Sequence, residues 1–232
     1  MSGQTAAAAV AAAVSLTCTV VVARRAARSS GDPRSALVAW TIGFALFTVA
    51  TCALWYGAWQ GWGERVFRLY YLTGGILVVA FLALGELLLV APGRRSTRLA
   101  VATMLWICFA STAAVLAANV DTDALASAGA TPPNGAMGGP WTTILAAVLN
   151  TVGTVVLLIG SVASSRRRRD PRPLLVAVGV GVVALASTAT RFDIYALFAL
   201  GQALGIALIL AGLVWRRLAG AETPSEASKP RS

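Results

Sequence analysis

The sequence contains no histidine, and only 12% of its 232 residues are charged. The missing histidine excludes His-ligated haem, His-based zinc hydrolysis and any serine–histidine relay. An average soluble domain has about 25% charged residues, so this chain has too little charge to cover a water-facing surface. Its sequence also shows no catalytic carboxylate pair and no recognisable nucleophile motif. We therefore expect no enzyme activity, no bound metal and no cofactor.

Apolar residues dominate instead: 57% of the chain is hydrophobic and the mean hydropathy is +0.75. A helix that crosses a membrane needs about 20 mostly apolar residues. Seven segments qualify, at about 5–23, 35–58, 67–91, 99–119, 141–163, 173–190 and 194–215. The sequence predicts an all-α integral membrane protein: a seven-transmembrane-helix domain over 1–218. A polar, proline-rich tail follows over 219–232, which we expect to be cytoplasmic and disordered.

The basic residues are distributed in a way that predicts the orientation of the chain. All but three of the 19 lie between the first and second, third and fourth, and fifth and sixth segments, or after the seventh. Short loops rich in arginine and lysine stay in the cytoplasm. We therefore expect a multi-pass plasma-membrane protein with its N-terminus outside and its C-terminus inside. The net charge of +10 is then a topology signal, and we expect no nucleic-acid partner.

The run Arg166–Arg169 is the densest of these basic segments. One interpretation is plain topology marking. The other is attraction of anionic inner-leaflet lipid, which contributes about 1 kcal/mol per basic residue near the surface. Membrane lipid is thus one expected partner, with an anionic-lipid site at this run as the sharper hypothesis.

A short motif recurs along the chain. Asp32-Pro33-Arg34 precedes the second segment and Asp170-Pro171-Arg172 precedes the sixth, each after an arginine-rich stretch. Proline suits the first turn of a helix, so the motif has a local function in starting helices. If the match marks a true repeat, segments 1–3 and 5–7 are parallel repeats and segment 4 connects them, a design known in transporters. Chance recurrence of three residues in a basic loop is the alternative.

This 3+1+3 plan resembles the transporter/opsin/receptor superfamily, which includes the SWEET sugar permeases and the microbial rhodopsins. The resemblance implies a seven-helix bundle built from two three-helix halves. The chain departs from the opsins because its only lysine is Lys229 in the tail, so no amine is available for a retinal Schiff base. It also lacks the Pro-Gln signature of the PQ-loop transporters.

Two further stretches carry a second resemblance. Arg68-Leu69-Tyr70-Tyr71-Leu72-Thr73-Gly74 and Asn150-Thr151-Val152-Gly153-Thr154 are similar to an uncharacterised family of actinobacterial seven-helix membrane proteins. This resemblance implies the same helix count and no particular activity.

Polar side chains at membrane depth are costly and often mark function. Glu86 is the candidate for coupling to a proton or cation, and pairing with Arg94 or Arg95 is the structural alternative. Asn150 and Gln202 either hold helices together or contact a solute. With Thr51 and Tyr71 they are our candidates for an outward-facing solute-binding pocket. Arg191 and Asp193 are expected to form an outer ion pair, either a helix cap or a gate.

Two function classes remain open at this stage. We expect the first of these, a small-solute transporter or permease without nucleotide hydrolysis, because of the parallel-repeat plan and the intramembrane amides. The second is a receptor, sensor or accessory subunit that acts through partner membrane proteins. A solvated cavity at Asn150 and Gln202 would favour the first class, and a dry core with an exposed apolar groove the second. The Gly201-Gln-Ala-Leu-Gly205 pattern allows close helix packing, expected within the bundle, and a homo-oligomer stays open.

Overall fold

The computed structural model describes residues 3–90, 93–133, 135–168, 172–189 and 195–214, and these are helical apart from short connections and one isolated β-bridge between Val120 and Met137. The helices are α1 (Gly3–Arg28), α2 (Asp32–Gln60), α3 (Glu64–Tyr70), the π-helix η1 (Tyr71–Leu77), α4 (Val78–Val90), α5 (Arg94–Ala117), α6 (Thr122–Ser127), α7 (Pro140–Arg168), α8 (Arg172–Ala189) and α9 (Tyr195–Val214). Arg169, Arg191, Asp193 and the tail 219–232 lie outside the described residues, so the expectations about them stay predictions.

Five helical spans of the described chain are long and apolar enough to cross a membrane. They are Thr5–Arg28, Pro33–Gln60, Glu64–Val90, Arg95–Ala117 and Pro140–Arg166. Helices α8 and α9 add shorter apolar stretches, Leu174–Val183 and Gly201–Gly212. The prediction of an all-helical chain suited to a membrane is confirmed in this form.

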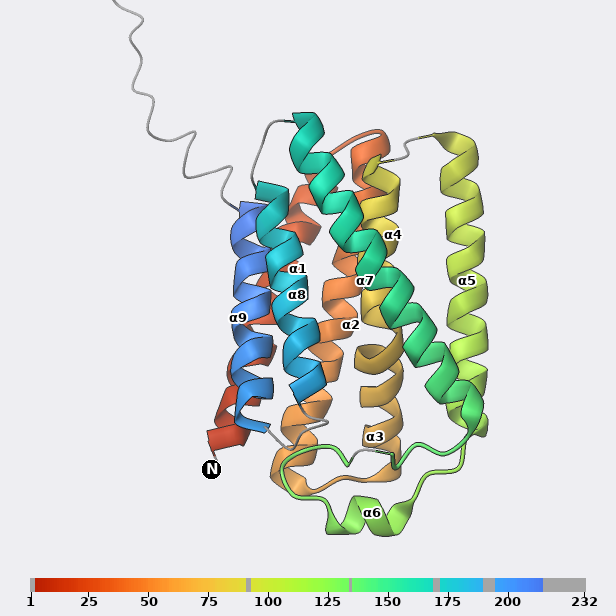
Figure 1. Ribbon diagram of the computed structural model, residues 1–232, viewed down its shortest axis with the longest axis vertical. Coiled ribbons are helices and arrows are strands. Elements are labelled where there is room, and N and C mark those ends of the chain that lie inside the picture. The colour runs from red at the N-terminus through yellow and green to blue at the C-terminus, as the bar shows by residue number, and fades with distance from the viewer. Residues whose placement is uncertain (1–2, 91–92, 134, 169–171, 190–194, 215–232) are drawn as a thin grey trace, which may run out of the picture.

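The third of these spans is a single rod made of α3, η1 and α4 (Figure 1). Within it the backbone widens from α-helix to π-helix over Tyr71–Leu77, where the Val78 amide donates to the carbonyl of Thr73, five residues earlier. Such insertions are rare and occur mostly as single turns inside α-helices, frequently at functional sites. The sequence analysis did not predict this π-helix.

Six helical elements of the described chain form a closed ring, with α3, η1 and α4 counted as one. Their order is α1, α2, α3–α4, α7, α8, α9, and α9 packs back against α1. Figure 1 shows that neighbours within α1–α2–α4 and within α7–α8–α9 run antiparallel. The two contacts that join these halves, α4 with α7 and α9 with α1, are between parallel helices. The ring is thus made of two three-helix halves, each running up, down and up.

Helix α5 lies outside this ring, against the rod α3–α4 and α7 (Figure 1). Its outward face is highly exposed: Leu105 is 67%, Trp106 68% and Phe109 66% accessible. Exposed large apolar side chains on this scale are unfavourable in water and are expected where lipid is the solvent. Helix α7 starts close to the end of α5 and then runs diagonally away from it (Figure 1), so the two helices diverge toward their other ends.

The two ends of the bundle differ in charge. The arginine-rich end is where α1 ends, α2 begins, α5 begins and α7 ends, and it is uppermost in Figure 1. Arg24, Arg28, Arg34, Arg95, Arg98 and Arg166 lie exposed there. The opposite, arginine-poor end has Arg65 and Arg68 among the described residues. The structure therefore gathers the basic loops at one end, as the alternation in the sequence requires.

A cap over the arginine-poor end is formed by the connection between α5 and α7. Its backbone is tied by Asp121 N to Ala136 O at 2.9 Å and by Gly138 N to Asn119 O at 2.7 Å. The Asp121 carboxylate caps α6 by accepting from the amides of Asp123 and Ala124. These hydrogen bonds hold the segment in place as a cap.

Glycines set the closest helix contacts of the ring. A Cβ on Gly85 of α4 would lie 1.8 Å from Trp40 Cδ1 of α2, so only glycine leaves room for that indole. The indole Nε1 then donates to Leu82 O at 3.1 Å. In the other half, a Cβ on Gly201 or Gly205 would lie 2.4–2.5 Å from side chains of α8. The predicted intramolecular use of the GxxxG pattern is confirmed.

The space enclosed by the ring is filled with apolar side chains. Cys18, Trp40, Phe44, Leu157 and Ile206 belong to one buried cluster that draws residues from α1, α2, α4, α7, α8 and α9. The void left at its centre holds only about 10 Å³, and its lining is apolar. A water molecule needs roughly 10–15 Å³ and polar partners, so this void is dry.

Candidate functional site

Thr51 lies in the contact between α1 and α2, not in an open pocket. Its side chain is 3% exposed, and its hydroxyl lies 3.2 Å from that of Ser15 on α1. A second hydroxyl pair, Thr19 with Thr48 at 3.2 Å, lies one turn further along the same contact. These pairs hold two helices together across the ring wall, the kind of contact that contributes about 0.6 kcal/mol in a membrane.

Asn150 on α7 reaches the π-helix. Its Nδ2 donates to the carbonyl of Gly75 in η1 at 2.6 Å. A π-turn shifts the backbone hydrogen bonds out of the α-helical register, and a side-chain amide from a neighbouring helix can pair a carbonyl in that segment. Asn150 therefore fixes α7 against the one irregular turn of its neighbour. The adjacent pair Gly74-Gly75 was the sequence feature that could have indicated it, since Gly pairs are frequent at helix distortions.

Tyr71 opens the π-helix at the same η1–α7 contact. Its hydroxyl lies within hydrogen-bonding reach of Thr142 and Thr143 in the first turn of α7. Its ring lies 6.2 Å from that of Phe67, while the preceding Tyr70 packs edge-on to Trp62 at 5.5 Å. Both tyrosines are half-buried and pack against the same buried apolar cluster. Of the two, Tyr71 is the one directed at α7.

The four proposed solute contacts therefore lie in different places. Tyr71 and Asn150 share the η1–α7 contact, Thr51 lies between α1 and α2, and Gln202 is half-buried on α9. Each of the first three is engaged by a neighbouring helix. Their contacts agree with the interpretation in which polar groups hold helices together. Solute contact by Tyr71, Asn150, Gln202 and Thr51 stays a prediction.

Glu86 is buried between α4 and α7, with 3% of its surface exposed. Ser164 Oγ donates to its Oε1 at 3.1 Å. Gly160, one turn before Ser164, makes space for the acid, since a Cβ there would lie 2.3 Å from Glu86 Cγ. The carboxylate thus occupies a fitted position in the contact that joins the two halves of the ring. Its role in coupling stays a prediction.

A wide hollow on the side of the bundle was not predicted from the sequence. It is a lateral groove of about 470 Å³ between α4, α5 and α7. Its lining is apolar except for two hydroxyls, Ser96 and Thr103, and consists of Ala80, Ala83, Leu84, Leu87, Leu88, Ser96, Leu99, Ala100, Thr103, Met104, Ile107, Leu149, Val152, Gly153 and Val156. This groove, which we call the α5 groove, lies on the side of the bundle toward the arginine-rich end.

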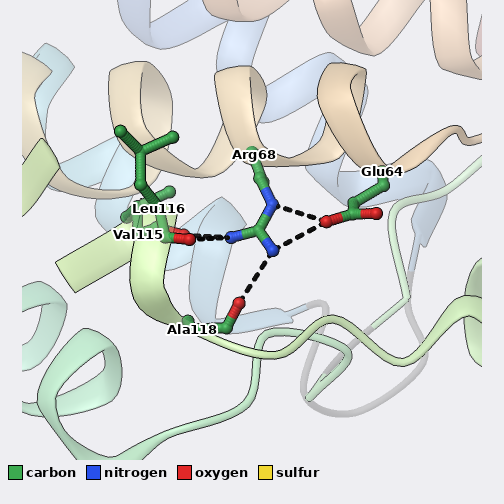
Figure 2. A network of polar contacts seen from close by, with 5 residues as sticks. All are labelled: Glu64, Arg68, Val115, Leu116 and Ala118. Carbon is green, nitrogen blue, oxygen red and sulfur yellow. Dashed lines mark hydrogen bonds and ion pairs between the residues drawn. The ribbon is translucent and has the colours of Figure 1, made fainter. Parts of the chain in front are cut away.

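The groove exists because α5 is fastened to the bundle mainly at its other end. There, Val115 is 1% exposed and belongs to the same buried cluster as Phe67. Arg68 on α3 reaches the last turn of α5 and donates to the carbonyls of Val115, Leu116 and Ala118 (Figure 2). Its guanidinium also pairs with Glu64 Oε1 at 2.7–2.9 Å. A cation at a helix C-terminus is favourable because the carbonyls there have no partners within the helix.

No family model, no curated protein and no solved structure matches this chain.

Proposed function

We propose that this chain is a multi-pass plasma-membrane protein of the receptor or accessory class, acting through the laterally open α5 groove and not by passing a solute through its ring. The observation that supports this choice is the contrast between the two hollows. The centre of the ring holds a dry void of about 10 Å³, whereas the α5 groove offers about 470 Å³. Ligand sites usually measure 300–1,000 Å³ and are mostly apolar with a few polar groups. The groove meets that description and the core does not.

The same proposal includes seven membrane crossings, with the arginine-rich end in the cytoplasm and the N-terminus outside. The basic residues support this orientation because they gather at one end of the ring, and short positive loops stay on the cytoplasmic side of the membrane. Single cysteines at two exposed serines test it: Ser127 in the cap and Ser30 between α1 and α2. An impermeant thiol reagent should label Ser127→Cys in intact cells, and Ser30→Cys only after permeabilisation. The reverse pattern would overturn the orientation.

Water access to the bundle tests the choice of groove over core. The native cysteines Cys18, Cys52 and Cys108 are first replaced by alanine, and single cysteines are then placed at Asn150 or Gln202. A water-soluble methanethiosulfonate reagent should leave both unmodified from either side of the membrane.

The cap variant Ser127→Cys, treated in the same membranes, is the reactive control. Modification of Asn150→Cys or Gln202→Cys at a rate close to that control would show water at the helix contacts. That result would contradict the proposal and favour the transporter.

The groove itself is tested by a spin label at Thr103, which lines it. In reconstituted vesicles, collisions of the label with oxygen should exceed those with a water-soluble nickel chelate, because oxygen partitions into hydrocarbon. Greater access for the chelate would mean that the groove is wet, and lateral binding from the bilayer would then be wrong.

A small-solute transporter is the second candidate, favoured by one observation. The ring consists of two halves with the same up–down–up order, joined by parallel contacts. A two-fold axis along the membrane normal would relate such halves, as in transporters built from parallel repeats. Under this alternative Glu86, buried where the halves meet, would carry the coupling proton or cation.

A further inference from the structure

The α5 groove has the length of one leaflet. Its lining on α5 runs from Ser96 to Ile107, which at 1.5 Å per residue is about 17 Å. The hydrocarbon core of a bilayer is about 30 Å thick, so one acyl chain spans about half of that. Beyond Ile107 the groove is closed, because the last turns of α5 pack on the buried cluster around Phe67 and Val115.

These dimensions decide between a lipid chain and a partner helix as the occupant. A membrane-spanning partner helix would need to continue over the full hydrocarbon core, whereas the groove lining on α5 ends at Ile107. A flexible acyl chain of one leaflet does not need that extra length.

The polarity of the groove changes along its length as that of a lipid does. Its wall on α5 is apolar from Ile107 up to Leu99 except for the Thr103 hydroxyl, and its last lining residue, Ser96, carries a hydroxyl at the arginine-rich end. Beside that mouth Arg95 lies exposed in the first turn of α5, and this turn contains no acidic residue. Arg95 precedes Leu99 by four residues and so lies one turn above it on the same face. The positive mouth complements an anionic headgroup.

We propose that the α5 groove binds one anionic phospholipid of the cytoplasmic leaflet, with an acyl chain between α4, α5 and α7 and its phosphate at Arg95. This inference rests on the proposed function and names the ligand of its site. It differs from the earlier hypothesis of lipid at Arg166–Arg169, because the chain-binding wall and the charged mouth belong to α5.

Native mass spectrometry of the full chain in detergent tests the proposal. Phosphatidylglycerol and phosphatidylcholine of equal chain length are titrated in turn, and the apparent Kd for the first bound lipid is measured. We expect phosphatidylglycerol to bind more tightly to the unaltered protein. Arg95→Gln should weaken its binding about fivefold, the factor that ~1 kcal/mol for one basic residue gives. Binding of phosphatidylcholine should stay within twofold.

A matched pair of alanines on α5 tests the acyl-chain wall. Ala100 lines the groove, whereas Ala102 is exposed on the other side of the helix, two residues away. Ala100→Trp should remove the first-bound lipid whatever its headgroup, and Ala102→Trp should retain it. If Ala100→Trp does not elute as a folded species in gel filtration, the smaller Ala100→Leu replaces it.

Three results would contradict the proposal, and each concerns a different part of it. Equal lipid binding by the two tryptophan variants would overturn the groove as the chain site. A retained preference for phosphatidylglycerol after Arg95 is replaced would overturn the headgroup site. A bound protein or second copy that Ala100→Trp releases would show a helix as the occupant, and so overturn the lipid. In all three cases a spin label at Thr103 that reports a hydrocarbon environment would leave the proposed function standing, so the two failures are distinguishable.

Discussion

Replacing Arg68 by glutamine should destabilise the protein by releasing α5 from the bundle. The guanidinium is 17% exposed and donates to three carbonyls at the C-terminal end of α5 as well as to Glu64 (Figure 2). A hydrogen bond to a charged group contributes about 1.5–3 kcal/mol, and a cation at a helix C-terminus about 0.3–1 kcal/mol. The bonds share one side chain and are not additive. We expect a total loss of about 3 kcal/mol.

Thermal unfolding in detergent, followed by tryptophan fluorescence, measures this loss. For a chain of this size 1 kcal/mol shifts Tm by about 2–4 °C, so Arg68→Gln should lower Tm by roughly 6–12 °C. Arg65→Gln is the matched control: Arg65 is exposed on the same helix, and surface changes usually stay within about 0.5 kcal/mol. Glu64→Gln should also cost little, because Glu64 is 48% exposed and exposed ion pairs contribute little.

Hydrogen exchange adds a local measurement to this test. In Arg68→Gln the amides in the last turns of α5 should exchange faster, while those of α8 and α9 keep their rates. If Arg68→Gln and Arg65→Gln unfold within about 1 °C of each other, the carbonyl contacts do not hold α5 and the reasoning is refuted.

The tight helix contacts give two further predictions. Gly85→Ala should cost about 1–3 kcal/mol, the usual cost of overpacking, because its Cβ would lie 1.8 Å from Trp40 Cδ1. Gly181→Ala is the control, because nothing lies within 4 Å of its Cβ position, and it should leave Tm nearly unchanged or raise it. Equal changes in Tm for Gly85→Ala and Gly181→Ala would contradict this account. Gly160→Ala should destabilise through its 2.3 Å contact with Glu86 Cγ, and Glu86→Ala should relieve most of that cost in the double variant. A double-mutant cycle that gives purely additive changes in Tm would refute the fitted contact.

Hydropathy and charge located the helices well because both depend on the solvent and not on tertiary partners. The second expected segment, 35–58, corresponds to α2 at Asp32–Gln60, and Pro33 lies in the first turn as the motif indicated. The fourth segment was placed at 99–119, whereas α5 begins at Arg94. Hydropathy could not find this extra turn, because its arginines and serine are polar yet continue the helix at the membrane surface.

The polar residues inside the membrane show what the sequence could not predict, namely their hydrogen-bond partners. Asn150 was selected as unusual, since an amide at that depth is costly. Its partner could not be named, because the Gly75 carbonyl lies 75 positions away and is presented by a π-turn. The same holds for Thr51, whose neighbour Ser15 belongs to another helix. Local sequence gives the cost of a buried polar group, but only packing shows which group satisfies it.

The sequence by itself determined that this chain is helical and apolar enough for a membrane, and that its basic residues alternate between segments. These properties follow from the composition of each segment alone. Only the tertiary structure decided that the void at the centre of the ring is dry, that the ring closes through α9 and α1, and that α5 stands apart. The physical reason is that α5 carries apolar residues on every side, so its composition gives no preferred face. The contacts of Arg68 and Val115 fix one end of α5. Toward the other end α5 diverges from α7, and the α5 groove lies in the space between them.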